Sequence, residues 1–211
     1  MRVKETSVYQ FGELSDTAKE KAREWWRGAS NGDNYFAESV IESASNIAEK
    51  YIGIDLKTHA VKLMNGNTRY DPAIWWSGFS YQGDGASYEG RYTFKKGGLK
   101  ALRKEWPTEQ ELDRIVVGLY KIQRRYNWAA AVDIGRSGSN YAHSRTMDFN
   151  DVGERELSAE DFQEVCQLLR DFADWIYDQL KAEYEYQMSD EVVDETIQAN
   201  EYEFDEEGRR A

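Results

Sequence analysis

The sequence predicts an α+β protein with a mostly antiparallel sheet of four to six strands and helices packed on one face. Two periodicities predict this class. Apolar residues recur every three or four positions in several long segments, as in amphipathic helices, and every second position in shorter segments, as in half-buried strands. The composition, 40% hydrophobic and 14% aromatic, gives a chain of 211 residues enough apolar surface to bury a core. We expect a single domain over residues 1–211.

The first quarter of the chain alternates between strand and helix signals. Residues 3–11 favour a strand, and Ser15 then caps an amphipathic helix that ends near residues 28–32. A second helix is predicted over residues 36–51, stopped by Gly53. Residues 54–64 change to a period of two, which predicts one or two short strands before a tight turn at Asn65-Gly66.

The segment WWSGFSYQGDGASYEG, residues 75–90, predicts a β-hairpin. Residues 86–94 alternate between polar and apolar, residues 74–81 are apolar on both faces, and the glycines around Asp84 allow a turn in which this side chain bonds the local backbone. A strand that is apolar on both faces needs other residues packed against each face. Trp75, Phe79 and Tyr81 therefore belong either to a central strand or to a surface on which a partner docks.

Helices dominate the rest of the chain. A short basic helix is expected over residues 95–106, and Thr108 with Glu111 forms a capping box for the next helix. A second hairpin pairs residues 128–134 with residues 141–149 through a turn at 135–140. The longest helix begins at Ser158, which is expected to form a capping box with Asp161. Ser189 caps a short last helix, and residues 201–204 form an edge strand.

The negative charge is concentrated near the C-terminus. The formal net charge is −12, and the helical segment 154–207 alone holds 19 acidic but only three basic side chains. Such a field either keeps the protein soluble or attracts a basic partner, and it disfavours direct binding of DNA or RNA. The basic cluster within residues 95–104 is too short to reverse this. The candidate partner-binding carboxylates are Asp171, Asp174, Asp178, Glu183, Glu185, Asp190, Glu191, Asp194 and Glu195.

The sequence offers little for catalysis. Only two histidines are present, His59 and His143, and a single cysteine, Cys166, which excludes an intrachain disulfide and favours a buried thiol. No nucleotide-binding or hydrolase motif occurs, and no cofactor or metal site is predicted. A divalent ion held by Asp84, Asp148 and Asp151 would lack an EF-hand pattern. Without an apolar run of membrane-spanning length or a signal peptide, we expect a cytoplasmic protein with no membrane contact.

Three stretches resemble a known group of proteins. They are ELSDTAKEKAREW at residues 13–25, VKLMNG at 61–66 continuing through YDP to WSGFSYQGDGA at 76–86, and the tail ANEYEF with GRR at 208–210. Together they are similar to a family of small acidic proteins from bacteriophages and prophages, often labelled antitoxins of toxin–antitoxin systems. The resemblance covers nearly the whole chain and brings no catalytic residues with it.

What the resemblance implies is an accessory protein in the cytoplasm of a host bacterium, one that neutralises a host defence by binding it, as anti-CRISPR and anti-restriction factors do. Combined with the acidic segment, this predicts an inhibitor that engages the basic nucleic-acid-binding site of a defence complex. Reversal of Asp178, Glu183, Asp190 and Glu191 to Lys should then abolish inhibition. The alternatives are an antitoxin that sequesters a toxin through hydrophobic contacts, and a metal-dependent enzyme acting at the Gly-Asp-Gly turn. The sequence does not specify an oligomeric state.

Overall fold

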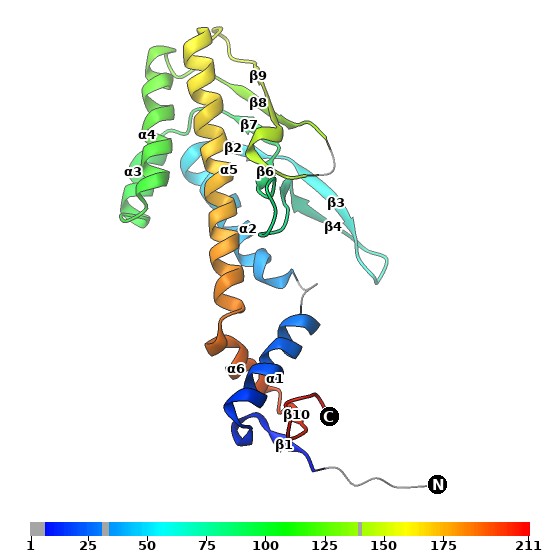
Figure 1. Cartoon of the computed structure of the whole chain (residues 1–211). Helices are drawn as coiled ribbons and strands as arrows, with labels where there is room; N and C mark the ends of the chain where they lie inside the picture. Colours follow the sequence, from blue (N-terminus) through cyan, green and yellow to red (C-terminus); the bar gives the residue numbers. More distant parts are fainter. Residues whose placement is uncertain (1–6, 31–33, 139–140) are drawn as a thin grey trace. The chain divides into compact units, whose positions relative to one another are not determined.

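The computed structural model describes residues 7–30, 34–138 and 141–211, and it confirms the α+β class (Figure 1). The chain forms two compact units. The terminal unit comprises Met1–Glu38 and Ala182–Ala211, and the central unit comprises Ser39–Lys181. A compact unit is not thereby shown to fold alone, so the single domain expected over residues 1–211 stays a prediction. Among the described residues, no helix combines the length and the apolar character that crossing a membrane requires.

The terminal unit brings both ends of the chain together in one short sheet. Strand β1 (Tyr9–Gln10) pairs antiparallel with β10 (Glu203–Phe204). Both strands are shorter than the expected ranges 3–11 and 201–204, because Phe11 begins a 3₁₀ helix and residues 201–202 precede β10. Residues 3–6 lie outside the described residues. Helix α1 (Asp16–Ala29) begins after Ser15, whose Oγ accepts a hydrogen bond from the Ala18 amide at 3.3 Å. Helix α6 (Asp190–Ala199) begins after Ser189 in the same way. Both predicted caps are confirmed.

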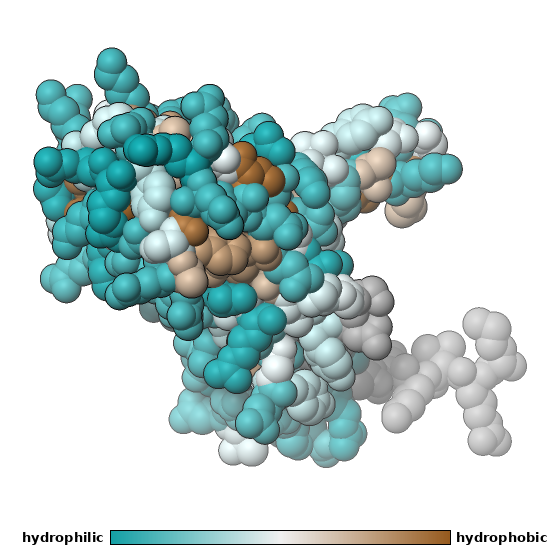
Figure 2. Space-filling view, turned by 90° about the horizontal axis from the view of Figure 1, so that it is seen from above, coloured by the Kyte–Doolittle hydropathy of each residue, from teal (hydrophilic) through white to brown (hydrophobic). Residues whose placement is uncertain are grey.

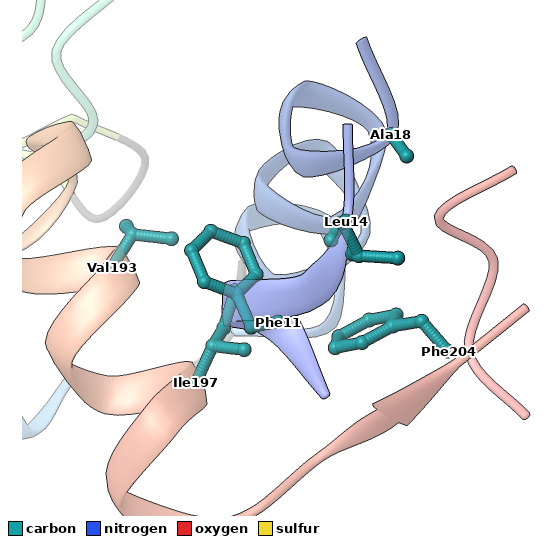
Figure 3. Close-up of a cluster of buried hydrophobic side chains, with 7 residues drawn as sticks. Phe11, Leu14, Ala18, Val193, Ile197 and Phe204 are labelled. Atoms are coloured by element: carbon teal, nitrogen blue, oxygen red, sulfur yellow. The ribbon is translucent and has the colours of Figure 1, made fainter. Parts of the chain in front are cut away.

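A small aromatic core holds this unit together (Figure 3). Phe11 and Phe204 meet edge to face, with ring centroids 6.5 Å apart, and Val193 and Ile197 of α6 line the same cluster. The Arg210 guanidinium lies 5.0 Å from the centroid of the Tyr202 ring, a cation–π distance. The C-terminal tail therefore has a structural role in closing this core.

The central unit contains most of the helices. Helix α2 (Tyr35–Ile47), which the unit boundary crosses, continues as a π-helical turn (Ala48–Ile52) and stops at Gly53, where φ is +92°. Helices α3 (Gly98–Glu105), α4 (Gln110–Arg125) and α5 (Ala159–Gln187) follow. The capping box predicted at Thr108 and Glu111 is wrong, because α4 begins only at Gln110 and its cap position makes no side-chain hydrogen bond.

At the start of α5 the predicted capping box is half formed. Ser158 Oγ accepts a hydrogen bond from the Asp161 amide at 3.1 Å, as expected. The Asp161 carboxylate, however, accepts from the Tyr126 hydroxyl at 2.8 Å, and that hydroxyl in turn accepts from the Ser158 amide at 2.9 Å. A tyrosine from α4's C-terminal end thus completes the cap.

Three antiparallel sheets complete the central unit. The largest has the strand order β2-β7-β8-β9, formed by Ile54–Leu56, Gly90–Tyr92, Val132–Arg136 and Met147–Asp151. Strands β3 (Thr58–Lys62) and β4 (Thr68–Pro72) flank the predicted turn at Asn65-Gly66, and β5 (Ile74–Trp76) pairs with β6 (Ala86–Tyr88). The pairing of the first predicted hairpin is confirmed. The second hairpin also forms, but its strands lie farther along the chain than predicted: residues 128–131 and 141–146 are outside them, and Gly135 and Arg136 of the predicted turn belong to β8. Residues 139–140 of the second turn lie outside the described residues.

Both strands of the first predicted hairpin are shorter than expected. The strand expected over residues 86–94 divides at Glu89, since β6 pairs with β5 whereas β7 pairs with β2 and β8. Gly90 permits this change of partner, because a Cβ there would lie 2.4 Å from the Asp55 carbonyl oxygen. The strand expected over residues 74–81 ends at Trp76, and residues 77–85 form a loop.

Helices and sheets pack through a few close contacts in the central unit. The Tyr88 ring meets the Phe172 ring edge to face at 5.6 Å, and its hydroxyl donates to the Leu169 carbonyl of α5 at 2.8 Å. Gly118 lets α4 approach α5 closely, because a Cβ there would lie 2.7 Å from Leu168 Cδ1. The predicted apolar stripe of α4 is buried throughout: Leu112, Ile115, Val116, Leu119 and Ile122.

Candidate functional site

Asp84 organises the Gly-Asp-Gly loop, residues 77–85. Its Oδ2 accepts hydrogen bonds from the Ser80 and Tyr81 amides at 2.8 and 2.7 Å, and Gly83 takes a φ of +134° that a residue with a side chain rarely adopts. The local backbone bonding predicted for Asp84 is confirmed. This carboxylate oxygen therefore has a structural task, which is to hold the loop closed.

Trp75, the first aromatic candidate for partner binding, is engaged within the central unit. The His59 ring stacks on it at 5.6 Å between centroids with an interplanar angle of 29°, and the Arg136 guanidinium lies 4.2 Å from its centroid. A guanidinium this close to an indole makes a favourable cation–π contact. Trp75 therefore contributes to the stability of the β5–β6 hairpin.

The other two aromatic candidates lie in the loop itself. The Phe79 ring stacks on Trp76 at 5.4 Å and contacts the Tyr177 ring of α5 at 5.6 Å, and the Tyr177 hydroxyl donates to the Gly78 carbonyl at 3.0 Å. Tyr81, in contrast, is 81% exposed. Of Trp75, Phe79 and Tyr81, only Tyr81 presents most of its surface to the solvent.

The acidic residues on α5 have different surroundings. Asp171 is neutralised within the central unit, because its carboxylate contacts Arg114 at 2.5 Å and accepts a hydrogen bond from Gln167 at 2.7 Å. Arg114 also contacts Glu111 of α4 at 2.5 Å. One arginine thus balances two carboxylates.

Farther along α5, Asp174 and Asp178 are exposed, and no ion pair to either is formed by the part of the chain that the structure describes. Partial burial raises the pKa of Asp178 above its usual value, and the charges of Asp174 and Glu111 raise it further, against an opposing contribution from Lys181. We call Asp174 and Asp178 the acidic α5 face. Glu111 lies on α4, where Arg114 pairs with it, and is not part of this face.

In the terminal unit, two of the candidate carboxylates stabilise the fold. The Asp194 carboxylate accepts two hydrogen bonds from Arg23, at 2.6 and 2.7 Å, and Asp190 contacts Arg27 at 2.5 Å, so that α6 is tied to α1. The hydrogen bond from Arg27 lowers the pKa of Asp190. The remaining candidates here are exposed or half-buried: Glu183, Glu185, Glu191 and Glu195.

Sequence reasoning missed the arginines that neutralise these carboxylates. Arg23 and Asp194 are 171 residues apart, and Arg114 and Asp171 are 57 residues apart. No local pattern indicates such pairs, because they depend on which helices pack together. The nine candidate carboxylates therefore include three that are occupied by this chain's own arginines.

The side chains that could take part in catalysis, such as Cys166 and Asp151, are buried or hydrogen-bonded within the fold. Burial raises the pKa of the Cys166 thiol to about 11, so that it is protonated at neutral pH. Asp151 accepts hydrogen bonds from the Gly153 and Leu157 amides. Over residues 7–30, 34–138 and 141–211, no three histidine, cysteine, aspartate or glutamate side chains gather as a metal site would require.

Hydrophilic side chains cover most of the face seen in Figure 2, and a smaller patch of hydrophobic side chains interrupts them. The mean hydropathy of the chain, −0.81, agrees with such a surface. On this face, hydrophilic side chains therefore predominate over hydrophobic ones.

A protein-family model described as a domain of unknown function, DUF8835, matches residues 36–190. This range contains the whole central unit. No match was found among the curated proteins or among the solved structures. Since the family model covers well over half of the sequence, the chain belongs to the DUF8835 family.

Proposed function

We propose that this chain is a phage-encoded anti-defence protein of the anti-CRISPR type, which acts by binding in the cytoplasm of the host bacterium. In this proposal the acidic α5 face engages a basic, nucleic-acid-binding site of a host defence complex. The observation that carries it is the pair of exposed carboxylates Asp174 and Asp178, four residues apart on α5, with which the described part of the chain forms no ion pair. Partial burial of Asp178 and the charge of Asp174 both raise the pKa of Asp178. A cationic partner surface would relieve this repulsion on binding.

The ion pairs narrow the set of carboxylates that are available to a partner. Asp190 and Asp194 hold α6 to α1, and Asp171 holds α5 to α4. Reversal of Asp190 to Lys would therefore disturb the terminal unit as well as any interface, so the four-site reversal suggested by the sequence is a poor test. Asp174 and Asp178 are better positions, because the described part of the chain forms no hydrogen bond or ion pair with either carboxylate.

The test is inhibition of a defined defence system in cells. Bacteria that carry a nucleic-acid-guided or restriction defence would express the wild type or the double variant Asp174→Lys/Asp178→Lys, and phage plating would be compared. We expect the wild type to restore plating and the variant to lose this effect. Glu154→Lys/Glu156→Lys is the matched control, because it changes the net charge equally at two exposed residues outside the acidic α5 face. Inhibition that survives in the α5 variant would refute the proposal.

A further inference from the structure

The central unit contains an open cleft of about 740 Å³ that neither the acidic residues nor the Gly-Asp-Gly loop accounts for. Its size falls in the range of small-molecule sites, which measure about 300–1,000 Å³. One wall is aromatic and the rim is basic. This combination, and not the volume alone, indicates the class of ligand.

Three rings form the aromatic wall: Phe94, Tyr120 and Trp128. The Trp128 centroid lies 4.4 Å from that of Phe94 and 5.0 Å from that of Tyr120. Trp128 is 40% exposed and Tyr120 is 37% exposed, so the rings present surface to the cleft as well as to one another. Exposed aromatic rings held in place by neighbouring rings form a platform on which a flat ligand can stack.

The backbone at Trp128 has a strained conformation. Asn127 and Trp128 adopt φ values of +52° and +67° directly after α4, and the Trp128 amide donates to the Gln123 carbonyl at 2.8 Å. A bulky residue rarely adopts this left-handed conformation. Here the unfavourable backbone geometry places an indole ring at the surface of the cleft, and such strain is often associated with binding sites.

The rim of the cleft is cationic. Lys95, Lys96 and Lys100 are exposed, and the described part of the chain provides no carboxylate that pairs with any of them. Arg103 also lines the cleft, but its guanidinium is bound to Asp113 at 2.5 and 3.1 Å. Three lysines without counter-ions in a chain of net charge −12 form a local site for an anion.

The N-terminal end of α3 adds to this positive potential. Gly97 precedes the helix with a φ of +81°, no side chain caps the helix, and no acidic residue occupies its first turn. Gly97, Leu99 and Lys100 line the cleft, so the positive end of the helix dipole lies at its rim. The Gly98 amide itself donates to the Lys95 carbonyl at 3.2 Å, so the contribution of this helix end is its positive potential, and the lysines supply the direct contacts to a phosphate group.

From these observations we infer that the cleft lined by Phe94, Trp128 and the three lysines Lys95, Lys96 and Lys100 binds a free nucleotide. The base stacks on the aromatic wall, and the phosphate contacts Lys95, Lys96 and Lys100 at the rim. The positively charged surface is small and the rest of the chain is acidic. A long nucleic-acid strand would therefore be repelled beyond the nucleotide that occupies the cleft. This inference is independent of the proposed anti-defence function.

Isothermal titration calorimetry with adenosine 5′-monophosphate and guanosine 5′-monophosphate tests the inference. Adenosine and inorganic phosphate each represent one part of a nucleotide, and an oligothymidylate strand represents single-stranded nucleic acid as the alternative ligand. We expect both nucleotides to bind at one site, and adenosine and phosphate each to bind at least about tenfold more weakly, because each makes only half of the contacts. No binding of either nucleotide would overturn the inference, and tighter binding of the oligonucleotide would reassign the cleft to a single strand.

Two variants distinguish this site from any other. Trp128→Gly removes the stacking ring and also relieves the left-handed backbone strain, so lost binding would not reflect a new clash. Lys96→Glu/Lys100→Glu reverses the charge of two side chains at the rim and leaves the three aromatic rings unchanged. Each should weaken nucleotide binding at least about tenfold. The controls are Tyr81→Ala and Lys62→Glu, exposed residues away from the cleft, and unchanged binding in both cleft variants would refute the inference.

Discussion

At the scale of single residues, Gly208 is the position where one methyl group would matter most. Its φ is +82°, and a Cβ there would lie 2.0 Å from the Ala18 carbonyl oxygen of α1. Gly208→Ala must therefore push the C-terminal tail away from α1, which would cost more than about 2 kcal/mol. Chemical denaturation followed by tryptophan fluorescence measures this loss, because Trp25 belongs to the affected core.

Gly28→Ala is the control for this prediction. Gly28 lies within α1, and a Cβ there would meet no atom within 4 Å. Alanine favours a helix, so this variant should gain about 0.5–1 kcal/mol. If Gly208→Ala were as stable as the wild type, the close approach of the tail to α1 would be wrong.

Contacts between residues close in the sequence could be predicted, whereas contacts between distant residues could not. The caps at Ser15 and Ser189 were predictable, because each hydrogen bond joins residues three positions apart. The pairing of Arg23 with Asp194 was not, because it depends on α1 packing against α6. The candidate carboxylates could therefore be named from the sequence, whereas those that the fold itself occupies could not.

At the scale of elements, α5 combines a buried stripe with an acidic face that destabilises it. Asp174 and Asp178 are four residues apart on the same helix, where two like charges cost a few tenths of a kcal/mol. Asp178→Asn should therefore raise the stability of the folded protein at pH 7 by about 0.5 kcal/mol. Thermal unfolding of the variant and the wild type in the same buffers measures the difference.

The sign of the pH dependence follows from the raised pKa of Asp178. The folded state holds the proton of Asp178 more tightly than the unfolded state, so this group lowers stability as the pH rises through its folded pKa. Below its ordinary value of 3.8 the group is protonated in both states. The advantage of Asp178→Asn should thus be present at pH 7 and vanish near pH 3, and an advantage independent of pH would contradict the electrostatic cause.

Periodicity predicted the helices better than the strands for a physical reason. A helix satisfies its own backbone hydrogen bonds, so the buried stripe of α4 can be predicted from local spacing. A strand needs a partner, and alternation over residues 86–94 identified the buried face without revealing that the partner changes at Glu89. The aromatic and basic cleft was missed for the same reason, since Phe94, Tyr120 and Trp128 come from separate elements.

At the scale of the whole molecule, the two proposed modes of binding differ in how strongly they depend on charge, and therefore on salt. An inhibitor that engages a basic surface through exposed carboxylates depends on electrostatic attraction, which salt screens. An antitoxin that holds a toxin through hydrophobic contacts depends on apolar burial, which salt does not weaken. Exposed apolar side chains are also available for the second mode, among them Tyr35, Met64, Tyr70 and Tyr81.

Affinity capture at two salt concentrations therefore tests the proposed mode of binding. The tagged protein would be incubated with a lysate of bacteria expressing nucleic-acid-guided and restriction defences, at about 100 mM and about 500 mM salt, where the screening length falls from about 10 Å to less than half of that. We expect a basic nucleic-acid-binding complex to be retained only at the lower salt, and to be lost at both concentrations with Asp174→Lys/Asp178→Lys. A small partner retained at both concentrations would instead support toxin sequestration, because burial of apolar surface, unlike attraction between exposed charges, survives screening.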